Sequence, residues 1–233
     1  MTELDNYLAT HYLDEVQLAA ASGLSIDEHR ALIRDRLVPA PSYVVSDSGT
    51  VSSFVFGEMA APGSKPGHYF HPSQLAWIAR ARSALADGAA DDAEVRLKEQ
   101  FAANFAAALS SLNRSTLRLR DSFDDQGAAI PDGLHTRTDT AWTYFLNGTF
   151  GLCVANPISE AHIAHKEVLQ EKLTQHSENG QRKAYPKHEL AAMEQLIDAY
   201  ASAAMPFSPV EYARSSRKRL VEDLRAGLSA NPA

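Results

Sequence analysis

The sequence predicts a mainly α-helical protein that carries one small β-hairpin near its N-terminus. Apolar residues recur at helical spacing from about residue 91 to residue 112 and again in several later segments. In the first third, two short helical segments instead meet at a glycine and are followed by alternating β-branched and polar residues. We therefore expect an N-terminal helix-turn-helix with a hairpin, followed by a helical C-terminal domain.

The helix-turn-helix is predicted from residues 12–43. Gly23 separates two apolar helical segments, and Ser25 is placed to cap the second of them. Pro39 and Pro41 end this second helix, because proline lacks the backbone N–H and restricts the residue before it.

The hairpin is predicted from residues 42–57, where β-branched and polar residues alternate around the turn pair Ser48 and Gly49. A helix-turn-helix that is followed by a hairpin is a winged helix-turn-helix. The acidic segment of residues 88–92 marks the best boundary after it. We expect a winged helix-turn-helix-like domain over residues 1–88 and a helical domain over residues 89–233.

Composition restricts the class of protein. A chain of 233 residues with 45% hydrophobic content can bury a sizeable core. No apolar run approaches the roughly 20 residues that cross a bilayer, and the N-terminus has acidic residues where a signal peptide would have basic ones. The single cysteine, Cys153, excludes an internal disulfide and a thiolate metal cluster. We expect a cytoplasmic protein, and no cofactor is indicated.

The net charge of −7 is spread unevenly along the chain. Residues 1–105 contain 8 Lys and Arg against 14 Asp and Glu, whereas residues 106–233 contain 14 against 15. DNA-binding proteins gain most of their affinity by neutralising phosphates with Lys and Arg. The acidic half contains the helix-turn-helix, which disfavours DNA as its partner.

The order of elements in the first third nevertheless resembles a known domain. The run Gln17-Leu18-Ala19, with Gly23, Leu24 and Ser25 after it, is similar to the pattern of the MerR-type winged-helix domain. That resemblance implies a ligand-responsive DNA-binding regulator, in which Arg30, Arg34 and Arg36 would contact DNA. Several departures oppose it, among them Ile33 where the family has an acidic residue and Arg36 where it has a glycine. Ala31 and Leu32 stand where the family has two tyrosines, and Asp27 and Glu28 at the start of the second helix would repel phosphates.

The second half resembles another family. Trp142 with the run FLNGTFGLCV, then Pro157-Ile158 and Lys166-Glu167, then PFSPVEYARSSRKRLVEDLR are similar to segments of a bacterial family of unknown function, often labelled a natural product biosynthesis protein. The resemblance implies a bacterial cytoplasmic protein of a specialised-metabolite pathway. It supplies no catalytic residues.

The glycine-rich turn of residues 147–153 is one candidate for a ligand site. Amide, hydroxyl and thiol groups could converge there beside an aromatic ring, and the residues concerned are Trp142, Asn147, Thr149 and Cys153. The alternative is close helix packing at Gly148 and Gly151. No histidine is identifiable as a base that would activate Cys153 as a nucleophile.

Two further clusters carry polar chemistry. Ser215, Ser216 and Arg217 could hold a phosphate or a carboxylate near a helix start, or could be part of the solvated face of the last helix. His162 and His165 lie three residues apart on one helix, a spacing that can share a metal ion. No second ligand pair accompanies them, so we predict solvated histidines and no metal site.

Two functions are consistent with these observations. The preferred one is an accessory or catalytic protein of a specialised-metabolite pathway that binds a small molecule or a partner protein. The alternative is a MerR-like, ligand-responsive transcriptional regulator. A partner-docking module without chemistry and assembly as a homodimer both stay open.

Overall fold

Three short helices begin the chain, namely α1 (Glu3–His11), α2 (Glu15–Ser22) and α3 (Ile26–Arg34). Gly23 ends α2 with a φ of 69°, the left-handed conformation that glycine adopts without strain. Ser25 caps α3, since its Oγ accepts a hydrogen bond from the Glu28 N–H while the Glu28 carboxylate accepts one from the Ser25 N–H. The predicted turn at Gly23 and the predicted cap at Ser25 are confirmed.

The computed structural model describes residues 1–88, 92–182 and 184–230. Within these ranges five strands form one antiparallel sheet in the order β1-β5-β2-β3-β4. The strands are β1 (Leu13–Asp14), β2 (Tyr43–Val45), β3 (Thr50–Ser53), β4 (Gly57–Ala60) and β5 (Gly67–Phe70). The short edge strand β1 pairs Leu13 with Phe70, and β2 pairs Tyr43 with Tyr69.

This sheet contradicts the predicted fold class of a mainly α protein with a winged helix-turn-helix and a small hairpin. The predicted hairpin exists as β2 and β3, but it is part of a larger sheet. The missed strand β5 lies between β1 and β2, so its partners are distant in sequence and no local alternation reveals it. Pro62, Gly63, Pro66 and Gly67 predict irregular structure over residues 59–70, but the first three precede β5 and Gly67 is its first residue.

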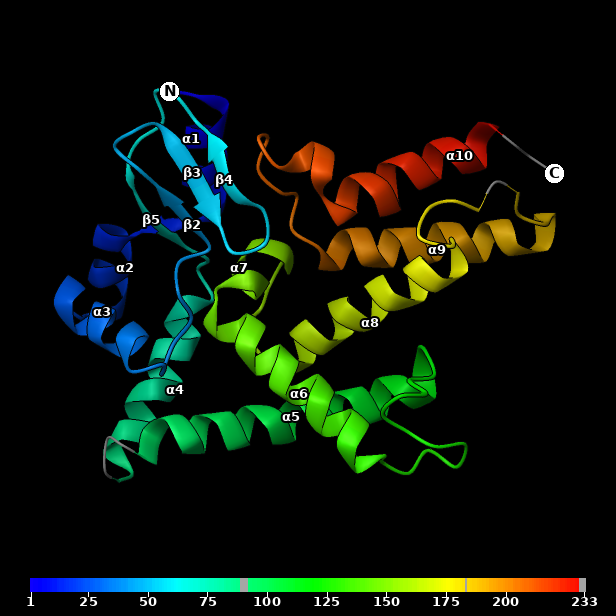
Figure 1. Ribbon diagram of the computed structural model, residues 1–233, viewed down its shortest axis with the longest axis horizontal. Coiled ribbons are helices and arrows are strands. Elements are labelled where there is room, and N and C mark those ends of the chain that lie inside the picture. The colour runs from blue at the N-terminus through cyan, green and yellow to red at the C-terminus, as the bar shows by residue number, and fades with distance from the viewer. Residues whose placement is uncertain (89–91, 183, 231–233) are drawn as a thin grey trace.

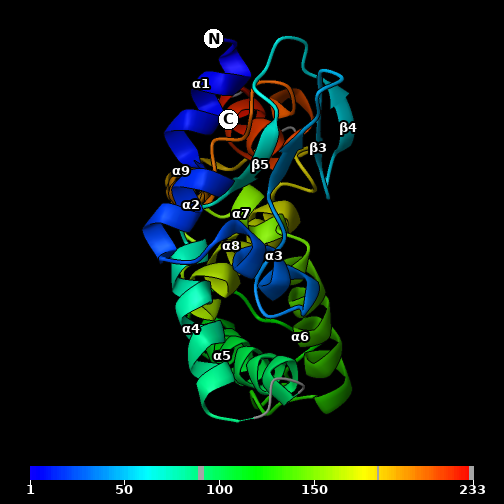
Figure 2. The same cartoon turned by 90° about the vertical axis from the view of Figure 1, so that its left-hand side faces the viewer.

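The rest of the chain is helical, as expected. In chain order the elements are α4 (Gln74–Ala86), α5 (Ala93–Ser115), α6 (Pro131–Leu146), α7 (Thr149–Cys153), α8 (Glu160–His176), α9 (Lys187–Ala203), the turn η2 (Tyr212–Arg214), the π-helical segment η3 (Lys218–Asp223) and α10 (Leu224–Ala230). Helix α8 packs against both α5 and α9 (Figure 1). The sheet and α1 lie at one end in the side view, and α4, α5 and α6 lie at the other (Figure 2).

The main hydrophobic cluster contains residues from both sides of position 88. It joins Tyr43 and Phe70 of the sheet to Phe101 of α5 and Trp142 of α6. A second cluster, around Leu173 and other residues of α8, α9, η3 and α10, packs these C-terminal elements against one another. The division into domains at residue 88 stays a prediction.

A buried carboxylate connects the sheet to the C-terminal segment. Glu211 is 1% exposed and accepts hydrogen bonds from the hydroxyls of Tyr43 at 2.6 Å, Ser53 at 2.7 Å and Ser208 at 2.9 Å. Burial raises the pKa of Glu211 above its ordinary value, although these three hydrogen bonds act in the opposite direction. The carboxylate thus fixes β2 and β3 against residues 208–211.

This environment gives a pH dependence. The native state binds the Glu211 proton more tightly than the unfolded chain does, so the free energy of unfolding is expected to fall as the pH rises from about 4.5, the ordinary pKa, through the raised pKa. Urea unfolding at a series of pH values checks it. Glu211→Gln should lose this slope, and Glu58→Gln, at an exposed position of β4, should keep it. An unchanged slope in Glu211→Gln would contradict the prediction.

Candidate functional site

A pocket of about 490 Å³ lies between the loop that joins β3 to β4, helices α7 and α8, and the C-terminal segment. Pockets of roughly 300–1,000 Å³ typically hold small ligands. We call it the hairpin pocket. It is lined by Phe54, Val55, Phe56, Tyr144, Thr149, Phe150, Leu152, Cys153, Lys166, Glu167, Gln170, Phe207, Arg214, Ser216 and Arg219.

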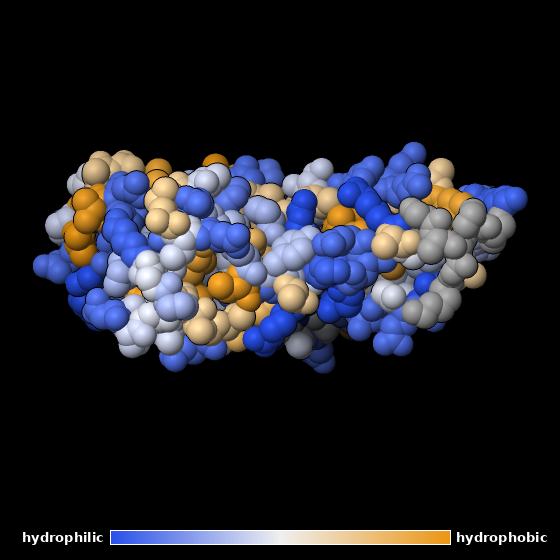
Figure 3. Space-filling view, turned by 90° about the horizontal axis from the view of Figure 1, so that it is seen from above, coloured by the Kyte–Doolittle hydropathy of each residue, from blue (hydrophilic) through white to orange (hydrophobic). Residues whose placement is uncertain are grey.

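The tip of the β3–β4 hairpin forms an apolar rim on this pocket. Phe54 is 59% exposed and Val55 is 49% exposed, which is unusual for adjacent large apolar side chains. Phe56 packs edge-on against Phe207 at 6.0 Å, and the Arg214 guanidinium lies 5.6 Å from the Phe56 ring. Seen from above, apolar patches lie among polar residues on the half of the molecule that holds the sheet (Figure 3).

A buried lysine forms part of the floor of the pocket. Lys166 of α8 is 2% exposed, and its Nζ donates to Glu167 Oε1 at 2.8 Å and to Gln170 Oε1 at 2.7 Å. Burial lowers the pKa of an ammonium, but interactions with its neighbours, among them the Glu167 carboxylate that accepts its hydrogen bond, raise the pKa of Lys166 above its usual value. Lys166 is therefore a buried cation at neutral pH.

Hydrogen bonds hold the neighbours of Lys166 in place. The Tyr200 hydroxyl of α9 lies 3.2 Å from Gln170 Oε1 and 2.7 Å from Ser216 Oγ. The polar chain thus continues from Lys166 through Gln170 and Tyr200 to Ser216 at the pocket wall. Side chains connected in this way form a preorganised surface, since each restricts the rotamer of the next.

Helix α7 places Thr149 and Cys153 in the same pocket. Gly148 precedes it with a φ of 74°, and a Cβ at this glycine would lie 2.5 Å from the Ala40 carbonyl oxygen. The close packing that the glycines predicted is therefore confirmed, and Thr149 and Cys153 of the turn line the pocket as well. Thr149 is 9% exposed, and its Oγ1 is buried with no hydrogen-bond partner in the described part of the chain.

The Cys153 thiol is not poised as a nucleophile. Burial raises its pKa to about 11, although the Lys166 ammonium acts in the opposite direction. The thiol is therefore protonated at neutral pH, and only the thiolate is a good nucleophile. Cys153 contributes a small, weakly polar wall to the pocket instead.

The charge of the pocket lining is positive on an acidic protein. Lys166, Arg214 and Arg219 face one carboxylate, that of Glu167, so the lining carries a net charge of +2. Arg219 is exposed, and across residues 1–88, 92–182 and 184–230 its guanidinium forms no ion pair or hydrogen bond. The surplus positive charge favours an anionic ligand.

The three residues of the predicted anion site, 215–217, do not act together in the structure. Ser215 is buried, and its Oγ donates to the Tyr212 carbonyl at 2.8 Å and accepts from the Lys218 N–H at 3.0 Å. Arg217 donates to the carbonyls of Ala201 and Ala204 at the end of α9. Ser215 and Arg217 therefore fix the local backbone, while Ser216 alone lines the hairpin pocket.

Trp142 and Asn147 lie outside the hairpin pocket. Trp142 is 3% exposed in the core beside Phe101 and Phe145, and its Nε1 has no hydrogen-bond partner among the described residues. Asn147 ends α6 through its backbone N–H. Of the four residues predicted around the glycine-rich turn, the structure brings together Thr149 and Cys153.

The three arginines proposed for DNA contact have different surroundings in the structure. Arg30 forms a two-point ion pair with Glu15, at 2.9 Å and 2.7 Å, and Arg36 pairs with Glu94 at 2.6 Å. Arg34 is exposed. Two of the three cations are thus already neutralised by carboxylates.

The histidines proposed for metal binding are exposed. His162 Nδ1 lies 2.7 Å from the Oγ of Ser159, which caps α8, and His165 is on the solvent side of the same helix. In the part of the chain that the structure describes, no group of three or more His, Cys, Asp or Glu residues could hold a metal ion.

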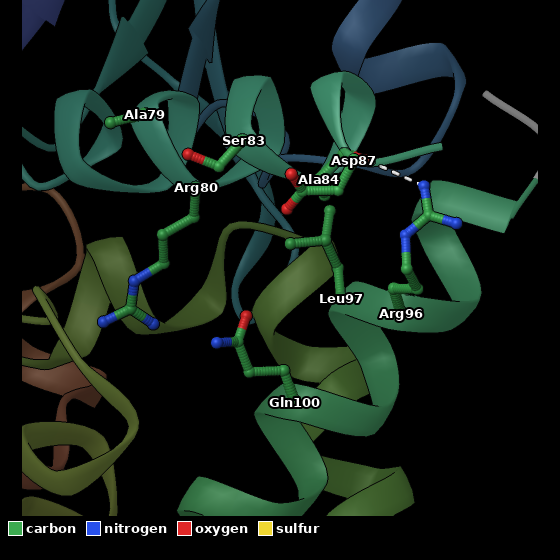
Figure 4. A pocket seen from close by; sticks show the side chains of 8 residues that line it. All are labelled: Ala79, Arg80, Ser83, Ala84, Asp87, Arg96, Leu97 and Gln100. Carbon is green, nitrogen blue, oxygen red and sulfur yellow. Dashed lines mark hydrogen bonds between the residues drawn. The ribbon is translucent and has the colours of Figure 1, made fainter. Parts of the chain in front are cut away.

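A second large pocket, of about 550 Å³, lies between α4 and α5 (Figure 4). Its two guanidiniums already have partners. Arg80 donates to both carboxylate oxygens of the buried Glu160 at 2.9 Å, and Arg96 donates to the Ala84 carbonyl at 2.7 Å. It offers less unsatisfied charge than the hairpin pocket, which we therefore take as the candidate site.

Sequence reasoning missed Lys166 and Gln170 as ligand-site residues. Lys166 lies three residues after Ile163 and three before Leu169, on the apolar face of α8, and a lysine at that spacing could have indicated a buried cation. The adjacent Phe54 and Val55 at a hairpin turn, where polar residues are usual, were the second available signal.

The fold and the pocket define a helical protein in which an antiparallel sheet supplies the rim of a cation-lined pocket. Residues 97–229 match the model of a family of unknown function, DUF6058, and the chain belongs to this family. The expected likeness to a family of unknown function is thereby confirmed, whereas the MerR-like domain is not supported. Neither the comparison with curated proteins nor that with solved structures finds a match. Among the described residues, no helix combines the length and apolarity that crossing a bilayer requires.

Proposed function

We propose that the protein binds a small amphipathic carboxylate in the hairpin pocket. One observation carries this proposal, namely the buried, protonated Lys166 on the floor of a pocket whose rim is aromatic. A cation that is 2% exposed loses most of its hydration, and an anionic ligand would restore favourable interactions.

The donors and the apolar surface fit the two halves of such a ligand. An ammonium has three N–H bonds, and Glu167 and Gln170 accept two of those of Lys166. A carboxylate is a stronger acceptor for the third than the thiol of Cys153 beside it. The rim residues Phe54 and Val55 would cover the apolar part of the ligand.

Binding is better supported than covalent catalysis. The Cys153 thiol and the Lys166 ammonium are both protonated at neutral pH, so neither is a nucleophile there. We further propose that the protein acts in the cytoplasm as an accessory protein of a specialised-metabolite pathway, a role consistent with holding an amphipathic acid. The regulator alternative has less support, because Arg30 and Arg36 are engaged by Glu15 and Glu94.

Thermal unfolding with added decanoate, a simple amphipathic carboxylate, tests the proposal. Decanoate is expected to raise the melting temperature, since a ligand that binds only the native state stabilises it. Arg219→Ala should weaken decanoate binding by up to roughly fivefold, the upper end of the range for an exposed charge pair. Arg34→Ala, at an exposed position of α3 far from the pocket lining, is the matched control and should bind as the wild type does.

Decyltrimethylammonium has the same chain and the opposite charge, and it is expected to give no such stabilisation below its micellar concentration. Equal stabilisation by both amphiphiles would show that the pocket does not select an anion. No stabilisation by decanoate would overturn the proposed function itself.

A further inference from the structure

A pocket of about 530 Å³ adjoins the hairpin pocket and shares three lining residues with it, Tyr144, Phe150 and Glu167. It lies between α5, α6 and α8, and we call it the helix pocket. We propose that one elongated ligand occupies both pockets, with its carboxylate in the hairpin pocket and a long alkyl chain in the helix pocket. This inference rests on the proposed function and names the class of ligand, a long-chain carboxylate.

The floor of the helix pocket is apolar. Phe105 and Leu109 lie four residues apart on α5 and are 2% and 1% exposed, so both face inward from one side of that helix. Ala141 of α6 and Phe150 of α7 extend the same surface. A chain of methylenes is the chemistry that such a surface binds without leaving polar groups unpaired.

Several polar groups around the helix pocket have partners within the protein. The hydroxyls of Thr136 and Thr140 donate to the carbonyls of Asp132 and Thr136, each at 2.8 Å. Arg137 is held between Asp121 at 2.6 Å and Glu171 at 2.7 Å, so its charge is neutralised. The surplus positive charge therefore lies at the hairpin pocket. We expect the carboxylate of the ligand there and its alkyl chain in the helix pocket.

Tyr144 stands where the two pockets meet. This residue is 42% exposed, so its ring is open to a ligand that lies between the two pockets. An alkyl chain that passes from one pocket to the other would lie against this ring and against Phe150. Because each pocket alone falls within the roughly 300–1,000 Å³ of a typical site, a compact acid would occupy one of them and leave the other empty.

Calorimetric titration with a series of straight-chain carboxylates, from octanoate to hexadecanoate and below their micellar concentrations, tests the inference. Affinity is expected to rise roughly fourfold for each added methylene along the series, the effect of burying one methylene. Thr140→Trp, at an exposed position of α6, should fill the helix pocket. This variant should bind octanoate as the wild type does and gain nothing from longer chains.

Thr143→Trp adds the same ring at an exposed position of α6 that does not line either pocket, and it should follow the wild-type series. If octanoate binds and the wild-type series is flat, the two-pocket inference is overturned and the proposed function stands. A rising series that Thr140→Trp leaves unchanged also overturns it. If no member of the series binds, the proposed function fails as well.

Discussion

Replacing Lys166 with methionine is expected to weaken decanoate binding by at least roughly thirtyfold, since removing one member of a buried charge pair costs about 2 kcal/mol or more. Methionine keeps most of the side-chain volume and removes the only cation of the pocket that is almost fully buried. Binding of decan-1-ol, which has the same chain without the charge, should change by less than about twofold. Calorimetric titration of both compounds measures the contrast.

The free protein should tolerate this change. Glu167 is about one third exposed, so water can replace the lost ammonium, and we expect the free energy of unfolding to fall by only about 1–2 kcal/mol. Urea unfolding gives this value. Equal losses of decanoate and decan-1-ol binding would mean that Lys166 only maintains the shape of the pocket, and the head-group contact would be wrong.

Substituting alanine for Gly148 is expected to lower the free energy of unfolding by at least about 3 kcal/mol. A residue with a side chain loses about 1–2 kcal/mol in the left-handed conformation, and the Cβ would also meet the backbone oxygens of Ala40 and Pro41 at 2.5 Å and 2.8 Å. Neither backbone oxygen belongs to a flexible side chain that could move away. The loop before β2 and the start of α7 would have to separate.

Gly23→Ala separates the two causes. Gly23 has a similar φ of 69°, but a Cβ there would meet nothing within 4 Å, so its cost should be only about 1–2 kcal/mol. Urea unfolding of the two variants side by side measures the difference. Equal destabilisation would show that the contact of Gly148 with the loop is not close. Because Thr149 follows directly, Gly148→Ala should also weaken decanoate binding.

Elements with local signals could be predicted from the sequence. The turn at Gly23 and the cap at Ser25 depend on neighbouring residues alone, and both are present. The long helix expected from about residue 91 is α5. Thr138 and Asp139 predict a helix start, but α6 begins seven residues earlier, at Pro131. Proline at the first helical position is itself a start signal, and the loop-like residues before it conceal it.

Elements that depend on distant partners could not be predicted. Strand β5 pairs on one side with β1, more than fifty residues earlier, and its four residues are too few for a periodic pattern. The candidate site follows the same rule. Thr149, Cys153 and Ser216 were selected by local glycine and serine signals, whereas Lys166 and the hairpin tip belong to the pocket only through tertiary packing.

The hairpin pocket is built from two separate stretches of the chain. Its floor comes from α7, α8 and the C-terminal segment, all within the residues that match the family, whereas the aromatic tip at residues 54–56 precedes the matched region. Changes in the tip can therefore alter which apolar body is accepted without touching the cation that holds the head group. Selectivity and anchoring would then evolve independently, on two separate stretches of the same chain.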